Sequence, residues 1–389
     1  MKKLIIYVTG FRQHAGKTVT SLGLISMLKK VVPAEEIGYI KPVGQELIKL
    51  PDGSKIDKDA VIIDKFSDIP DLDLGNVSPV RLGSGFTKEF LKKENKKEET
   101  KTLTDSILHS LKAMEEKRVI VAEGTGHPGV GGIVGLSNAI VGNIMNADII
   151  FLSGGGIGRA LDQLEVDLSY FMYRQSNVRG IIFNKCFPEK IETMKKYITE
   201  DLLNKKYLGF QNPLRILGFL PSVEDLGKPS MRVLQGLFPA AKVIGKIEEQ
   251  AWTVPCLRTR IISLAAEVLK IEKYLKPSDL VVIGSGSERR IKNIIEYNKQ
   301  MTGSIGGLII TCGDASPVSD SLEKDILAAG IPTLFVSDDT ATAEQRVLKS
   351  FENTKIQPYD AKKMREIEEM FEIYFDMDKF LDMYPELKQ

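Results

Sequence analysis

A glycine-bracketed turn that ends in a lysine and a threonine carries the clearest chemistry in this sequence. An apolar run over residues 4–9 precedes the turn Gly10–Thr18, and the apolar positions of residues 19–28 then recur at helical spacing. A buried strand, a turn and a helix form the context that a phosphate-binding loop requires. The N–H groups of such a turn and the dipole of the helix favour an anion at one point.

Lys17 and Thr18 supply the two side chains that this chemistry needs. The lysine adds a mobile positive charge for the outer phosphates, and the threonine hydroxyl is a hard oxygen ligand suited to Mg²⁺. Five residues separate Gly10 from Gly16, which is longer than the commonest spacing. An ordinary strand–turn–helix with a chance Gly-Lys-Thr is the alternative, and the surrounding pattern argues against it. The residues expected to contact a nucleotide are Gly10, His14, Ala15, Gly16, Lys17, Thr18 and Val19.

Two charged residues stand at the ends of further predicted strands. Lys41 follows the apolar stretch 37–40 and precedes Pro42, which cannot continue a central strand. At such an end a lysine reaches a phosphate or a substrate carboxylate, and the alternative is a solvated lysine. Glu123 ends the apolar stretch 119–122, where a buried acid is costly unless it has a cation partner such as Mg²⁺.

Three weaker candidates follow the same logic. Asp59 lies at the start of a short helical pattern, so it is either a metal ligand or a helix cap. The glycine-rich turn 154–158 and Arg159 precede another helix and are suited to an anion. Asn184 follows the predicted strand 178–183. Its carboxamide can donate and accept, which suits a purine edge, and a plain turn residue is the alternative.

Strand and helix patterns alternate along the chain and predict an α/β protein. Over residues 1–225 they indicate one mostly parallel sheet of the P-loop NTPase type, with helices on both faces and with the chemically loaded turns along one edge. Apolar strands recur near residues 242, 280, 307 and 333, which predicts a second, smaller α/β domain over 226–389. Its last apolar positions, around residues 364–375, form an amphipathic helix, which we expect to dock on its own domain or on a partner subunit.

Composition narrows the class of protein. The 389 residues carry a formal net charge of +1, which gives no support for a general nucleic-acid or acidic-membrane surface. The three cysteines lack paired spacing, so neither a disulfide framework nor a zinc site is expected. The first apolar run leads directly into the loop without a cleavage-type segment, and no run approaches roughly 18 apolar residues. We expect a cytoplasmic protein that binds neither nucleic acid nor membrane.

With these residues identified, the first domain resembles the dethiobiotin synthetase-like branch of P-loop proteins. The motifs that carry the resemblance are the stretched loop ending Gly16-Lys17-Thr18, Lys41-Pro42-Val43, Glu123-Gly124 and Asn184. The resemblance implies that Lys17 and Lys41 contact phosphates or the reacting carboxylate of ATP-dependent chemistry. It implies that Mg²⁺ is held, directly or through water, by Thr18, Asp59 and Glu123. It also implies that Asn184 reads adenine. The Thr-Asp-Thr run that dethiobiotin-forming enzymes carry in the loop is absent from residues 11–15.

The second domain resembles the so-called DRTGG domain. The stretches that carry this resemblance are 230–233, 274–282, 306–310 and 337–343. Together the two domains are similar to the N-terminal, non-catalytic half of long bacterial phosphotransacetylases. The DRTGG sequence itself is replaced by residues 284–290, a turn before a helix that is either an anion site or a plain tight turn.

Two classes of function therefore stay open. The first is a Mg-ATP-binding regulatory or interaction module with possible ATPase activity, and the attached DRTGG-like domain favours it. The second is an ATP-dependent ligase that phosphorylates a carboxylate or carbamate, so that an amine can displace the phosphate. The expected partners are the nucleotide, a small carboxylate or amine metabolite, and a second copy of the chain in a dimer.

Overall fold

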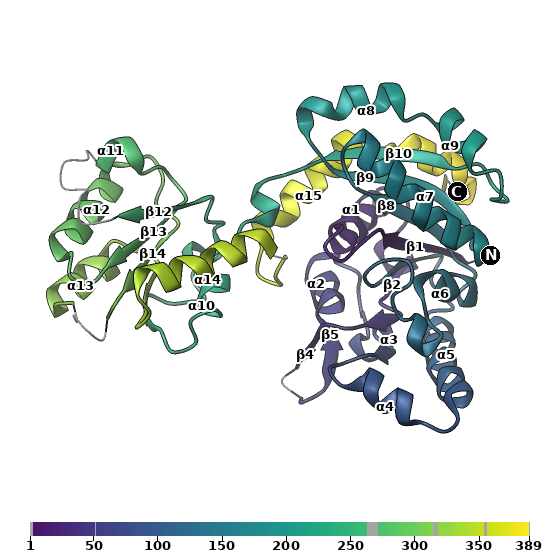
Figure 1. Ribbon diagram of the computed structural model, residues 1–389, viewed down its shortest axis with the longest axis horizontal. Helices are drawn as coiled ribbons and strands as arrows, with labels where there is room; N and C mark the ends of the chain where they lie inside the picture. Colours follow the sequence, from purple (N-terminus) through teal and green to yellow (C-terminus); the bar gives the residue numbers. More distant parts are fainter. Residues whose placement is uncertain (1–2, 51, 263–270, 314–317, 354–355, 389) are drawn as a thin grey trace. The chain divides into compact units, whose positions relative to one another are not determined.

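The computed structural model describes residues 3–50, 52–262, 271–313, 318–353 and 356–388. The chain forms two compact units. The first comprises Met1–Ser222 together with Met364–Gln389, and the second comprises Val223–Lys363. Each unit has its own sheet and its own apolar core (Figure 1).

A six-stranded sheet organises the first unit, and every neighbouring pair in it is parallel. Its strand order is β10 (Arg215–Pro221), β9 (Val178–Cys186), β8 (Asp148–Ser153), β1 (Leu4–Gly10), β7 (Val119–Glu123) and β2 (Ile37–Ile40). The predicted fold class is confirmed. Because parallel strands all end at the same edge, the segments after β1, β2, β7, β8 and β9 are gathered there.

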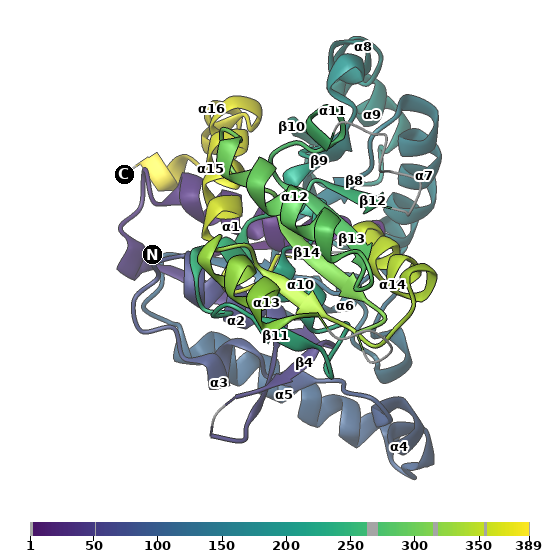
Figure 2. The ribbon, with the colours of Figure 1, turned by 90° about the vertical axis from the view of Figure 1, so that its left-hand side faces the viewer.

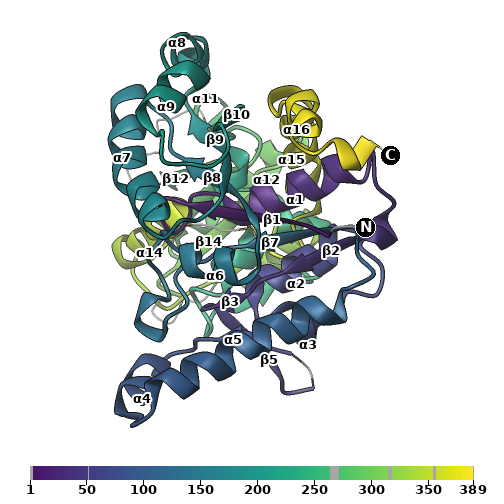
Figure 3. The ribbon, with the colours of Figure 1, turned by 90° about the vertical axis from the view of Figure 1, so that its right-hand side faces the viewer.

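Helices cover both faces of this sheet. The central strand β1 is therefore buried throughout. On one face Tyr7 and Phe151 pack in a core shared with α5 (Lys96–Ala113), α6 (Asn138–Ile144) and α7 (Ile157–Tyr173). The alternate residues of β1 face α1 (Lys17–Leu28), since successive side chains of a strand point to opposite faces. Figure 3 shows α5, α6 and α7 on one side and α1 on the other.

The first unit contains further short elements besides its main sheet. They include the pair β3 (Val43–Gly44) and β6 (Val80–Arg81), the hairpin β4 (Leu47–Lys49) and β5 (Lys55–Asp57), and the helices α2 (Lys58–Phe66), α3 (Leu74–Val77), α4 (Phe86–Lys92), α8 (Ile191–Tyr197) and α9 (Glu200–Lys206). Residues 88–101, which are rich in lysine and glutamate, form the end of α4 and the start of α5. Within the described ranges no helix is both long and apolar enough to cross a bilayer.

The second unit is built on a five-stranded sheet. Its strand order is β11 (Lys242–Ile244), β15 (Thr333–Phe335), β14 (Gly307–Thr311), β13 (Asp279–Gly284) and β12 (Arg258–Ile262), and only β11 pairs antiparallel within the described sheet. One face packs on α12 (Glu288–Gln300) and α13 (Asp320–Ala328), and the other on α10 (Met231–Gln235) and α14 (Thr340–Asn353). Figure 2 shows these helices around β13 and β14. A short helix, α11 (Ile271–Tyr274), precedes β13.

Sequence analysis missed strand β12 because its side chains are largely polar. Arg258 and Arg260 alternate along it, and both pair with the fully buried Asp279 on the neighbouring strand, at 2.7 and 3.1 Å. An edge strand with charged side chains does not show the apolar run that identified the other strands.

The C-terminal segment belongs to the first unit, which corrects the predicted assignment of residues 226–389 to one domain. From Met364 onward, α15 (Ala361–Tyr374) and then α16 (Met377–Met383) pack on α1 and β10 (Figure 1). A Cβ on Gly23 of α1 would lie 2.1 Å from the ring of Phe371, so only glycine allows this approach. The N–H of Asp376 donates to the carbonyl of Leu217 at 2.8 Å. The helical spacing of the segment identifies its apolar face but not which sheet receives it.

We predict that Phe371→Ala lowers the free energy of unfolding of the first unit by about 3–5 kcal/mol, because it leaves a cavity against α1. Phe371 is fully buried, whereas Ile373 on the same helix is 71% exposed. The control Ile373→Ala should therefore change stability by less than about 0.5 kcal/mol. Urea unfolding of both variants checks this. Equal effects would show that α15 is not part of the core.

Candidate functional site

The turn between β1 and α1 is tight and adopts left-handed backbone conformations. Gly16 caps α1 with φ +96°, and His14 also has a positive φ of 61°. A Cβ on Gly16 would lie 2.2 Å from Nδ2 of Asn184, so both conformation and space require glycine. Lys17 begins the helix, and its buried Nζ donates to the carbonyls of Arg12 at 3.0 Å and Gly126 at 3.1 Å. The Lys17 side chain thus links the turn after β1 to the segment after β7.

Asn184 is hydrogen-bonded to the backbone of this loop. It lies inside β9 rather than after it, and it is almost completely buried. Its Nδ2 donates to the carbonyl of Ala15 at 2.8 Å, and its Oδ1 accepts from the N–H of Lys185 at 2.8 Å. The predicted contact with adenine stays a prediction. The structure adds that the same carboxamide fixes the backbone of the phosphate loop.

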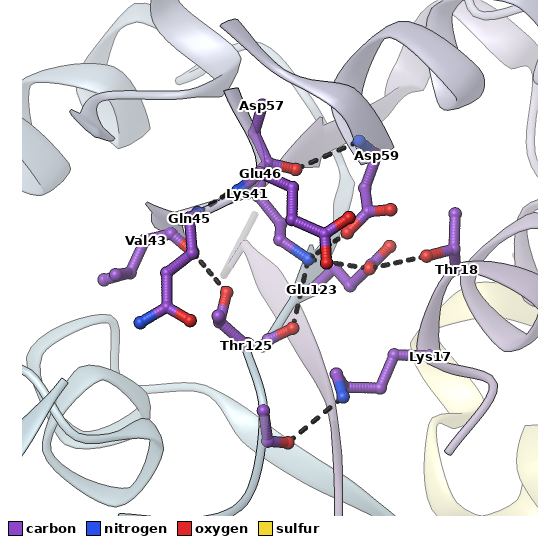
Figure 4. Close-up of polar contacts among 12 residues, drawn as sticks. Lys17, Thr18, Lys41, Val43, Gln45, Glu46, Asp57, Asp59, Glu123 and Thr125 are labelled. Atoms are coloured by element: carbon purple, nitrogen blue, oxygen red, sulfur yellow. Dashed lines mark hydrogen bonds and ion pairs between the residues drawn. The ribbon is translucent and has the colours of Figure 1, made fainter. Parts of the chain in front are cut away.

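A buried ammonium joins the other predicted site residues. Nζ of Lys41 lies 2.6 Å from Oδ2 of Asp59, 2.8 Å from Oε1 of Glu123 and 3.2 Å from the carbonyl of Gly124. Lys41 is 2% exposed and Glu123 is completely buried, which excludes the solvated alternative for Lys41. Figure 4 shows the ammonium pointing between the two carboxylates. A buried charge of this kind persists only when it is paired and hydrogen-bonded.

The charges of this cluster shift one another's pKa. Burial acts to lower the pKa of Lys41, but the carboxylates of Asp59, Glu123 and Asp57 outweigh it and hold that pKa well above its usual value. Burial raises the pKa of Glu123 to about 7, although Lys41 acts in the opposite direction. Lys41 is therefore a firmly protonated cation, and its protonation does not change near neutral pH.

Thr18 adds a hydroxyl oxygen to this cluster through Glu123. Its Oγ1 donates to Oε1 of Glu123 at 2.9 Å, so Thr18, Glu123 and Asp59 all lie around one point (Figure 4). Hydroxyl and carboxylate oxygens are the ligands that Mg²⁺ prefers, and Mg²⁺ usually keeps several waters as well. The described residues contain no cluster of three His, Cys, Asp or Glu side chains that could bind a metal by itself. The set fits a metal that also takes ligands from phosphates and water, and the ammonium of Lys41 demonstrates that it accepts a cation.

Two further residues of the cluster escaped sequence analysis. Asp57 caps α2 by accepting from the N–H of Asp59 at 3.0 Å, so the cap is Asp57 and the carboxylate of Asp59 is left to pair with Lys41. The hydroxyl of Tyr39 donates to Oε2 of Glu123 at 3.2 Å. Tyr39 stands two residues before Lys41, so strand alternation places both side chains on one face, a signal that was present in the sequence.

Asn138 shapes the glycine-rich segment after β7. Its Nδ2 donates to the carbonyls of Thr125 and His127 at 2.8 Å each, and its Oδ1 accepts from the N–H of Thr125 and from the hydroxyl of Tyr7. A Cβ on Gly124 would lie 2.7 Å from that Oδ1. The carbonyls of Gly124 and Gly126, which face Lys41 and Lys17, are positioned by this network.

The remaining sequence candidates do not join the cluster. Arg159 lies within the exposed first turn of α7, and no described hydrogen bond or ion pair connects it to the phosphate loop. The turn 284–290 belongs to the second unit. There the hydroxyl of Ser285 donates to the carbonyl of Cys312 at 3.1 Å, and Oε1 of Glu288 accepts from the N–H of Ser319. These contacts are those of a structured turn, and the structure does not test an anion site there.

A strand, a glycine-capped loop and a Lys-Thr helix start, beside a strand that ends in a buried acid, define a P-loop NTPase-like domain. Residues 5–230 match the family model AAA_26, described as an AAA domain. This match covers more than half of the chain, and the chain belongs to that family. No curated protein matches the sequence.

Three solved structures show weak likenesses. One is the structure of the CBS and DRTGG domains of the regulatory region of Clostridium perfringens pyrophosphatase, complexed with the activator diadenosine tetraphosphate. It shares 16% identity with this chain, with a TM-score of 0.25. The match covers 33% of this chain and 51% of that chain. The signal recognition particle receptor FtsY from Elizabethkingia anophelis, in complex with GDP, shares 11% identity with a TM-score of 0.31. The match covers 56% of this chain and 57% of that chain. The septum site-determining protein MinD from Pyrococcus horikoshii OT3, complexed with Mg-ADP, shares 12% identity with a TM-score of 0.32. The match covers 58% of this chain and 83% of that chain. The chain thus spans only about half the length of the first two structures, and likenesses this weak do not support a shared ligand.

Proposed function

We propose that the first unit binds ATP with Mg²⁺ at the phosphate loop. The observation that carries the proposal is the convergence of Lys17, Thr18 and the Lys41–Glu123 pair at one edge of the sheet. The loop amides and Lys17 would hold the phosphates. Thr18, Glu123 and Asp59 would hold Mg²⁺, directly or through water, and the metal would neutralise charge on the phosphate oxygens.

The nucleotide that we propose is an adenine nucleotide. Asn184 stands beside the loop, and the residues after it are Lys185, Cys186 and Phe187. Guanine sites that begin Asn-Lys usually have an aspartate two residues after the lysine, and Phe187 stands there instead.

We predict that unlabelled ATP displaces a bound fluorescent ATP analogue at a lower concentration than GTP does. Displacement by GTP at equal concentration would refute the preference.

We further propose that the chain works as a nucleotide-responsive regulatory or interaction module with ATPase capacity. The support is the pairing of a P-loop domain with a second α/β unit, whose sequence resembles the DRTGG domain attached to phosphotransacetylases. In this role nucleotide binding would favour one state of the chain, which a partner then recognises. A dimer remains part of the proposal, and sedimentation of the purified chain tests it.

An ATP-dependent ligase is the second candidate, and the buried Lys41 beside the loop favours it. In such a reaction a carboxylate or carbamate oxygen attacks the γ-phosphorus and ADP leaves. An amine then attacks the acyl carbon and phosphate leaves. Lys17, Lys41 and Mg²⁺ would stabilise charge on the transferring group. ADP release that requires an added amine and bicarbonate would favour the ligase, whereas release without them would favour the module.

We predict that Lys17→Ala weakens ATP binding by about 1.5–3 kcal/mol, or roughly tenfold to 150-fold, because it removes a charge-assisted hydrogen bond to phosphate. Lys195→Ala is the control, since this lysine is exposed and pairs only locally with Glu192 among its described contacts. Isothermal titration calorimetry with Mg-ATP measures both. An unchanged affinity in Lys17→Ala would place the nucleotide elsewhere.

A further inference from the structure

The ammonium of Lys41 occupies the position in which a metal ion would neutralise the same oxygens. It lies within 2.8 Å of one carboxylate oxygen of Asp59 and one of Glu123, and the second of these also accepts from Thr18. Three acceptors, including the carbonyl of Gly124, surround its nitrogen. An ammonium has three N–H donors, so the cluster is a satisfied cation site.

A second cation cannot share this position with the ammonium. Mg²⁺ prefers oxygen ligands at about 2.0–2.1 Å in near-octahedral geometry, or water-mediated contacts slightly further out. In either case it would lie only a few ångströms from a buried positive charge, where repulsion is strong in the protein interior. Mg²⁺ and the ammonium therefore compete for the carboxylates of Asp59 and Glu123.

We propose that Lys41 is the resident counter-ion of the metal site and that Mg²⁺ displaces it when the nucleotide binds. This inference rests on the proposed Mg-ATP site. Without nucleotide, displacement would leave a desolvated ammonium with no anion, which is unfavourable. The triphosphate removes that obstacle because it brings the metal and offers its own negative charge to the released lysine. The site consequently responds to the Mg-nucleotide complex and hardly to free Mg²⁺.

The closing experiment measures Mn²⁺ binding to the full chain by electron paramagnetic resonance, with no nucleotide present. We expect Lys41→Met to bind Mn²⁺ about tenfold more tightly than the wild type, because the competing cation is gone. Lys41→Arg keeps a positive charge at the position and should bind as weakly as the wild type. The double variant Lys41→Met/Asp59→Asn should lose the gain. Circular dichroism checks that each variant is folded, and Lys41→Gln replaces Lys41→Met if that variant does not fold.

Two outcomes separate this inference from the proposed function. If the neutral variant binds Mn²⁺ no more tightly than the wild type and Lys41→Arg, competition by Lys41 is refuted, even where Mn-ATP binds normally to the wild type. If the wild type binds no Mn²⁺ when ATP is added, the proposed Mg-ATP site itself is refuted. A gain that persists in the double variant would also overturn the inference, because the metal would then be using other ligands.

Discussion

A positive charge buried between carboxylates is the interaction on which the site depends. Lys41 and Glu123 lie at the ends of adjacent strands, and neither is accessible enough for water to stabilise its charge. Removing one partner of such a pair typically costs about 3–5 kcal/mol, because the other charge remains buried and unpaired. The cluster is therefore under a constraint that an apolar strand end would not have. It needs a cation, and we propose that Mg²⁺ takes over this role from Lys41 when the nucleotide binds.

The fold meets this constraint by placing short, rigid segments at one sheet edge. Tyr39 in β2 and Lys41 directly after it lie on one face, and Glu123 at the end of β7 lies beside them. Asn138 and Asn184 then fix the two loops that face the site, each by hydrogen bonds to backbone groups. Satisfied buried amides of this kind hold loops in one conformation. Geometry at the phosphate loop thus comes from the strands and helices beneath it, and α15 adds to this support by packing on α1.

Much of this arrangement follows from local sequence patterns. The apolar run before Gly10 and the Gly16-Lys17-Thr18 ending are enough to predict a strand, a turn and a helix, because each depends on neighbouring residues. The position of Glu123 and Lys41 at parallel strand ends predicts that they meet. Their direct ion pair was not predicted, since a pattern that identifies strand ends does not give side-chain distances. By sequence Asp59 was either a metal ligand or the cap of this helix, and only the observed helix start shows that Asp57 is the cap. The docking of the C-terminal helix depends on long-range contacts, among them Phe371 on Gly23 and Asp376 on Leu217, and no local signal reveals them.

The central claim is that the strand-end acid Glu123 serves a metal-bound nucleotide. Calorimetric titration of ATP with and without Mg²⁺, in the wild type and in Glu123→Gln, tests it most directly. The substitution keeps the shape of the side chain and removes its charge. We predict that Mg²⁺ tightens ATP binding about tenfold or more in the wild type and has little effect in Glu123→Gln, while binding without the metal persists in both. Equal enhancement by Mg²⁺ in the two proteins would show that Glu123 is a structural partner of Lys41 and not part of a metal site.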